Sequence, residues 1–218
     1  MNRLWGCALI ALLLGGCATP PRPQPQATPA ASTVAEFAAA IAADASRSDH
    51  ESDSRTRSEL AAEASQEAAA CISLEPQAAA CLYGRAIALG LEARAHPTRA
   101  GELLSAMLGS LGNAEAADPT YDEAGPARVR ALVLLRAPGW PLGPGDPEAA
   151  VVAARRAASL RPQYPPNLLA LAEALAKTGD SKGARANYER ARELAQSLPA
   201  TAERDNWLHE ADEALRRQ

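Results

Sequence analysis

Apolar and small residues recur at helical spacing along most of the chain after about residue 33. Leu168, Leu171, Ala172 and Leu175, for example, are separated by three, one and three positions, which places them on one face of a helix. The chain shows no clear run of alternating apolar and polar residues, the pattern of a half-buried β-strand. The sequence therefore predicts an all-α fold.

Two helical segments repeat at a spacing of 34 residues. The stretch GDPEAAVVAARRAASLRP from Gly145 aligns without gaps with GDSKGARANYERARELAQ from Gly179. Asp146 and Asp180 stand where an aspartate caps the following helix, and Gly179 suits the end of the preceding one. Small residues recur at matching positions, where two helices must approach closely. This period and arrangement resemble the tetratricopeptide repeat (TPR), a pair of antiparallel helices.

The other segments follow this scheme more loosely. Pro76, Pro119 and Pro162 each close an alanine-rich helix and lie 43 residues apart. The clearest repeats span 120–162 and 165–198. Residues 33–46 and 58–74 are expected to form a degenerate first hairpin, joined by the polar connector SRSDHESDSRTR (46–57). With a last helix near 202–216, we predict a TPR-type α-solenoid of about four hairpins plus a C-terminal capping helix, over residues 33–218.

The amino terminus carries a targeting signal. An apolar run from Leu4 to Leu14 is too short for a membrane span, which needs about twenty residues. Leu14-Gly15-Gly16-Cys17 resembles a bacterial lipobox, which implies a signal peptide over residues 1–16 and a lipid on Cys17; the alternative is an ordinary signal peptide with an incidental cysteine. With Ala18 after the cysteine, the resemblance implies an anchor in the outer membrane of a Gram-negative bacterium, facing the periplasm.

A proline-rich linker is expected over residues 17–32, because Ala18–Ala31 contains five prolines and favours an extended polyproline conformation. Beyond it, Cys71 and Cys81 form an even pair in an oxidising compartment. They lie at the end of one predicted helix and the start of the next. They form either a disulfide or two buried free thiols.

Composition and charge argue against several functions. The net charge is -4 and no basic stripe is present, so we expect no nucleic-acid partner. His50, His96 and His209 stand alone, without metal-ligand spacing, a phosphate loop or a nucleophile elbow nearby. The sequence predicts no enzyme, no metal and no cofactor.

A binding role directs attention to the first helix of each hairpin and to one loop. The loop RAPGWPLGP (136–144) is about seven residues longer than a plain repeat needs. Its Trp140 either packs onto the helices or awaits a partner. By register, three arginines could converge on an anionic group; the alternative is that they are solvated surface charges. The binding candidates are Tyr83, Arg85, Arg128, Leu132, Arg136, Trp140, Glu173 and Lys177.

The lipobox, the expanded repeats and the stretch DPTYDEAGPARVRALVLLRAPGWPLGPGD (118–146) together resemble the TatT-like family. Its members are TPR lipoproteins associated with tripartite ATP-independent periplasmic (TRAP) transporters. The resemblance implies a membrane-anchored accessory that binds a periplasmic solute-binding protein, a small ligand or both. The alternatives are a scaffold for outer-membrane or pilus assembly, and a carrier of small ligands without a protein partner.

Overall fold

The structure is a computed structural model that describes residues 32–217. Within this range the chain forms nine α-helices, one 3-10 helix and no β-strand. The predicted signal peptide, Cys17 and all but the last residue of the predicted linker lie outside the described residues. The helices are α1 (Val34–His50), α2 (Ser54–Leu74), α3 (Ala79–Ala95), η1 (Pro97–Arg99), α4 (Ala100–Ala117), α5 (Tyr121–Arg136), α6 (Pro147–Leu160), α7 (Pro165–Lys177), α8 (Ser181–Gln196) and α9 (Ala202–Arg217).

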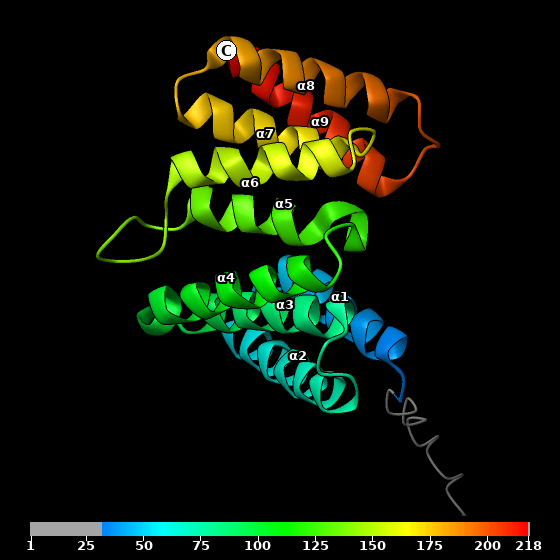
Figure 1. The fold of residues 1–218 in the computed structure, drawn as a ribbon, viewed down its shortest axis with the longest axis vertical. Helices are drawn as coiled ribbons and strands as arrows, with labels where there is room; N and C mark the ends of the chain where they lie inside the picture. Colours follow the sequence, from blue (N-terminus) through cyan, green and yellow to red (C-terminus); the bar gives the residue numbers. More distant parts are fainter. Residues whose placement is uncertain (1–31, 218) are drawn as a thin grey trace, which may run out of the picture. The chain divides into compact units, whose positions relative to one another are not determined.

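Consecutive helices pair into four hairpins, α1–α2, α3–α4, α5–α6 and α7–α8, and α9 packs on α7 and α8. Figure 1 shows the hairpins following one another in chain order. The predicted all-α solenoid with a C-terminal capping helix is confirmed. Trp207 and Leu215 of α9 pack against the apolar core that runs from α5 to α9.

Side-chain caps define where several helices begin. The carboxylates of Asp146 and Asp180 accept hydrogen bonds from the backbone N–H groups of Ala149 and Gly183, which satisfies donors that the first helical turn leaves free. Gly179 takes a φ of +90° after α7, a conformation that glycine adopts without steric cost. The predicted roles of these three residues are confirmed.

The predicted polar connector between the first two helices is wrong in extent. Only residues 51–53 lie outside α1 and α2. Asp53 caps α2 through the N–H of Thr56, and Arg57 donates to the carbonyls of Glu51 and Ser52. These local bonds keep a polar sequence helical almost to the turn, which its composition alone did not indicate.

Small residues allow neighbouring helices to approach closely. Ala61, Ala64 and Ala68 of α2 are at most 2% exposed. A Cβ atom added to Gly84 of α3 would lie 2.8 Å from Cδ1 of Ile41 of α1. Only glycine fits at this crossing without a shift of its neighbour, so Gly84 lets α1 and α3 pack closely.

The first and second hairpins are also joined covalently. Cys71, near the end of α2, and Cys81, near the start of α3, form a disulfide with their Sγ atoms 2.05 Å apart. Both residues are fully buried. The disulfide therefore holds the α2–α3 turn where the second hairpin begins.

Acidic side chains gather between α1 and α2. Asp44 is 5% exposed and accepts a hydrogen bond from Nη1 of Arg47 at 3.0 Å. Oε2 of Glu67 is buried and accepts no hydrogen bond from any part of the chain that the structure describes. Burial raises the pKa of the Glu67 carboxyl above its usual 4.5, and the charges of Asp44 and Glu63 raise it further.

This raised pKa predicts that Glu67→Gln increases the free energy of unfolding at neutral pH but not at acidic pH. The folded state holds the Glu67 proton more tightly than the unfolded state, so stability falls as pH rises from 4.5 through the higher folded pKa. The glutamine variant lacks this loss. We expect it to exceed the parent protein in free energy of unfolding at pH 7 and to match it closely at pH 4, measured by urea unfolding.

Glu59→Gln is the matched control, because it removes one negative charge from an exposed position of α2 that pairs with Arg55. The control is expected to change the free energy of unfolding little. A Glu67→Gln variant that is less stable than the parent protein at pH 7 would contradict the prediction.

Candidate functional site

The strongest candidate site is a hollow between the first helices of the first three hairpins. Its volume is about 390 Å³, within the range of small binding sites. We call it the groove. α1 contributes mainly small side chains, α3 contributes Tyr83 and Gly84, and α5 contributes its first two residues. The lining residues are Ala38, Ile41, Ala42, Ala45, Ser46, Asp49, Ala80, Tyr83, Gly84, Ile87, Tyr121 and Asp122.

Other hollows have a similar size but fewer lining residues. One, of about 350 Å³, lies between α2 and α3, and another, of about 400 Å³, is lined by residues of α4, α5 and α6. The groove differs from both because it gathers two tyrosines and two aspartates from three helices above an apolar floor. Convergent polar groups of this kind are what give a hollow selectivity.

The α5 side of the groove depends on an unusual backbone turn. Asp122, Glu123 and Ala124 have φ values of 48°, 54° and 64°, so three successive residues other than glycine are left-handed. Such a conformation costs about 1–2 kcal/mol per residue. We call residues 122–124 the left-handed turn. It persists only if surrounding side chains hold it.

Arg128 and Asn167 hold the left-handed turn. Nη1 of Arg128 donates to the carbonyls of Asp122 and Glu123, and its Nη2 lies 2.9 Å from Oδ2 of Asp122. Asn167 is fully buried at the start of α7. Its Nδ2 donates to the carbonyl of Glu123 at 3.0 Å, and its Oδ1 accepts from Arg128 at 3.2 Å. We call Arg128, Asn167 and the turn the Asn167 cluster.

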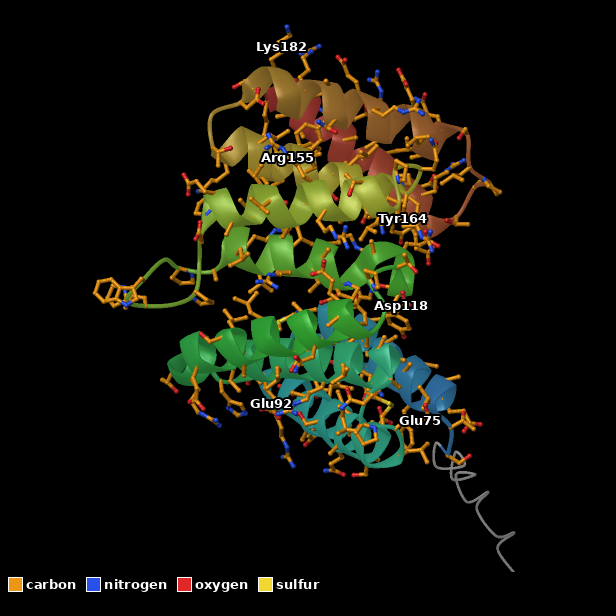
Figure 2. The ribbon with its side chains drawn as sticks, viewed as in Figure 1. Glu75, Glu92, Asp118, Arg155, Tyr164 and Lys182 are labelled. Carbon is orange, nitrogen blue, oxygen red and sulfur yellow. A yellow bond between two sulfur atoms is a disulfide. The ribbon has the colours of Figure 1, made fainter. Side chains whose placement is uncertain are left out.

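The Asn167 cluster extends to neighbouring helices. Nδ2 of Asn167 also lies within hydrogen-bonding distance of the carbonyls of Ala157 and Arg161 at the end of α6. The guanidinium of Arg128 lies 5.1 Å from the ring centroid of Tyr164, which contacts Trp207 of α9 edge-on. Figure 2 labels Tyr164 and Asp118 at the same end of the helices. Residues from four helices therefore meet at one polar site.

Tyr83 connects the groove to the left-handed turn. Its hydroxyl donates to Oδ2 of Asp122 at 3.0 Å, and its ring meets that of Tyr121 edge-on at 5.5 Å. Burial, and then the charge of Asp122, raise the pKa of Tyr83 well above its ordinary value. A Cβ atom on Gly125 would lie 2.9 Å from this hydroxyl. Glycine at 125 therefore leaves room for the tyrosine to reach Asp122.

The three predicted groove arginines do not converge, and the prediction of an anion site is wrong. The Arg128 side chain is 11% exposed and satisfied by the Asn167 cluster. Arg136 binds Glu173 through two hydrogen bonds, of 3.1 and 2.6 Å. Arg85 borders the separate hollow between α2 and α3. Groups of the chain itself occupy both guanidinium groups. The Arg128 guanidinium is largely buried and therefore requires such partners, whereas Arg136 is exposed and pairs with Glu173 at the surface.

The remaining candidates are also dispersed. Of the eight predicted binding residues, Tyr83 lines the groove. Leu132 is half-buried on α5, and Lys177 is exposed at the end of α7. Glu173 serves as the partner of Arg136. The register of the repeats did not predict these positions, because the groove depends on how α1, α3 and α5 pack and not on the periodicity of any one helix.

Trp140 is 90% exposed, so the interpretation in which it packs onto the helices is wrong. The 137–145 loop is ordered by its own backbone instead: the N–H of Gly145 donates to the carbonyl of Pro138, and the N–H of Leu142 to that of Gly139. Figure 1 shows the loop between α5 and α6 extending away from the helices. The second interpretation, that Trp140 awaits a partner, stays a prediction.

Sequence reasoning missed Asn167 and Asp122. Asn167 is the one polar residue in the stretch PPNLLALA (165–172), and an isolated polar side chain at a buried helical position calls for a hydrogen-bonding role. The string Ala124-Gly125-Pro126 was a second signal, since glycine and proline together interrupt a helix. Neither signal identified the groove, which depends on how α1, α3 and α5 pack.

No model of a known protein family and no curated protein matches the chain. Among solved structures, the chain is similar to a thermophilic TPR protein of Thermus thermophilus, with a TM-score of 0.56 and 21% sequence identity over 82% of this chain and 91% of that one. The chain has a TPR fold. At this identity the likeness shows the fold alone, and the resemblance to TatT-like lipoproteins stays a prediction.

In a TPR fold the first helices of the hairpins line an extended concave surface. The groove lies on these helices, α1, α3 and α5, so it occupies the surface that such solenoids present to partners. Within residues 32–217 no helix is long and apolar enough to span a bilayer, and no group of three metal-ligand side chains gathers.

The Asn167 cluster predicts a large stability loss for Asn167→Leu. Leucine has a similar size but removes the amide that donates to the carbonyl of Glu123 and accepts from Arg128. We expect the free energy of unfolding to fall by about 2–4 kcal/mol, because each lost hydrogen bond to a buried or charged group costs about 1–3 kcal/mol. Urea unfolding measures the difference.

Asn187→Leu is the control, since the Asn187 amide donates only to the carbonyl of Gly183 within α8. This variant is expected to lose less than about 1 kcal/mol. Equal losses in the two variants would show that the Asn167 cluster contributes no more to stability than the Asn187 hydrogen bond within α8.

Proposed function

We propose that this protein is a lipid-anchored periplasmic TPR protein that binds a protein partner through the groove. The TPR fold supports a role in protein–protein interaction. The observation that carries the proposal is the groove itself, an open hollow of about 390 Å³ on the first helices of three hairpins. A preformed hollow with an apolar floor and a few polar groups is suited to a projecting segment of a partner.

The lipid anchor is proposed at Cys17, on the lipobox Leu14-Gly15-Gly16-Cys17. The disulfide between Cys71 and Cys81 supports an oxidising compartment, because such bonds are rare where thiols are kept reduced. The proposed location is the outer membrane, with the helical domain in the periplasm.

The proposed partner is the solute-binding protein of a TRAP-type transporter. The sequence of residues 118–146 supports it, because this stretch carries the resemblance to TatT-like proteins. The same stretch includes the left-handed turn and the projecting loop. A scaffold role in outer-membrane or pilus assembly is the alternative, and the partner's identity distinguishes the two.

Capture of the partner tests the proposal. We would cross-link the full chain, tagged at its C-terminus, in cells and identify the recovered proteins. Ala42 is exposed on α1 and lines the groove, whereas Ala43 is equally exposed and does not line it. Ala42→Leu is expected to lower recovery of the partner at least about fivefold by filling the groove, while Ala43→Leu retains it.

The outcome of the capture separates the proposals. A solute-binding protein recovered in a groove-dependent manner supports the transport role, and outer-membrane assembly proteins in its place support the alternative. Recovery that is unaffected by Ala42→Leu would rule out the groove. In that case Trp140→Ala, which removes an exposed side chain outside the core, tests whether the 137–145 loop makes the contact.

Membrane fractionation tests the anchor separately. Cys17→Ser removes the thiol that would carry the lipid, so we expect the variant to leave the membrane fraction for the soluble periplasmic fraction. Cys7→Ser, within the predicted signal peptide, is the control and is expected to remain at the membrane. Membrane retention of the Cys17 variant would overturn the anchor.

A further inference from the structure

Negative charge is concentrated in the first hairpin, whose first helix, α1, forms one side of the groove. Residues 33–75 contain nine acidic and three basic residues, a net charge of -6, whereas the whole chain has a net charge of only -4. The remaining residues are therefore slightly positive in sum. The first hairpin is therefore strongly acidic, whereas the rest of the chain is nearly neutral.

The lining of the groove has the same sign. Its two charged side chains are the carboxylates of Asp49 and Asp122, and none of its twelve lining residues is a lysine or an arginine. The two side chains are 60% and 46% exposed. The charge around the groove therefore suits a cation.

An arginine supports each carboxylate from within the chain. Asp49 pairs with Arg94 at 2.7 Å, and Asp122 pairs with Arg128 at 2.9 Å. A carboxylate offers about four acceptor sites on its two oxygens. Asp49 uses one of them for Arg94, and Asp122 uses two, for Arg128 and the Tyr83 hydroxyl, both on Oδ2. The arginines hold the two carboxylates in place while acceptor sites stay available to a further donor.

The apolar part of the groove suits the aliphatic stem of a basic side chain. Ile41, Ala42 and Ile87 make an apolar floor, and Tyr83 and Tyr121 line the same hollow. Lysine and arginine bury their aliphatic stems on apolar surface and keep the charged head at polar groups. Tyrosine rings also attract cations.

We propose that the groove binds a segment of the partner protein that carries a lysine or arginine beside an apolar side chain. This inference rests on the proposed function and adds the chemistry of the partner. The apolar residue occupies the floor between α1 and α3, and the basic residue reaches Asp49 or Asp122. The proposed ligand is a cation, whereas the sequence predicted an anionic ligand.

Peptide binding tests this inference directly. Three end-blocked peptides of equal length share a central pair of leucines and differ only in two flanking residues, which are lysine, glutamine or glutamate. Calorimetry with the purified full chain measures each Kd in 50 mM and 500 mM NaCl. We expect the lysine peptide to bind about tenfold more tightly than the glutamate peptide at low salt, and the ratio to shrink at high salt because of screening.

Variants of the chain locate the binding. Asp49→Asn is expected to weaken the lysine peptide about threefold, the value of one exposed ion pair. Glu59→Gln, which removes an acidic residue of α2 outside the groove lining, is the charge-matched control and should leave the Kd unchanged. Ala42→Leu should weaken all three peptides, whereas Ala43→Leu should not.

Equal affinity for the lysine and glutamate peptides would overturn the inference, and so would binding that Ala42→Leu does not weaken, or no binding by any peptide at millimolar concentration. The outcome for the proposed function is distinguishable from the outcome for this inference. A partner captured through the groove by a segment without basic residues would retain the function and remove the cationic preference. Selective binding of the lysine peptide without a captured partner would retain the cationic preference of the groove and remove the proposed function.

Discussion

The buried amide of Asn167 is the interaction on which the centre of this structure depends. It donates to a carbonyl of the left-handed turn, lies within hydrogen-bonding distance of two carbonyls at the end of α6 and accepts from Arg128. A strained turn, a helix end and a buried guanidinium are thus satisfied at one point. Each would be costly alone, since polar groups removed from water need partners. Together they fix how the third hairpin begins.

The candidate groove follows from that constraint. Because the turn is left-handed, Tyr121 and Asp122 lie beside Tyr83 of α3, where they close the hollow that α1 and α3 leave open. Small residues on α1, together with Gly84, keep the hollow from being filled. The strain at the start of α5 and the small side chains elsewhere both lower stability locally. They leave the candidate groove open in a fold that otherwise packs helix against helix.

Most of the fold could be predicted from particular residues. Asp146, Asp180 and Gly179 set helix boundaries through contacts within a few positions, and such local chemistry is visible in a sequence. The candidate site was largely missed. Of the predicted binding residues, Tyr83 lines the groove. The others were chosen from the register of single repeats and from one loop, which do not specify how α1, α3 and α5 pack. The sequence left open whether Trp140 packs or is exposed. The loop, which is ordered by its own backbone hydrogen bonds, leaves it 90% exposed.

The sequence by itself determined the all-α class, the order of the hairpins and the capping helix. These depend on periodicity and on capping, which act over a few residues. The tertiary structure alone decided which partners the arginines take, where the groove lies and what charge it presents. Arg128 and Arg136 look alike in the sequence, yet their partners Asn167 and Glu173 lie 39 and 37 residues away. Partners at such separations are chosen by helix packing, which no local pattern specifies.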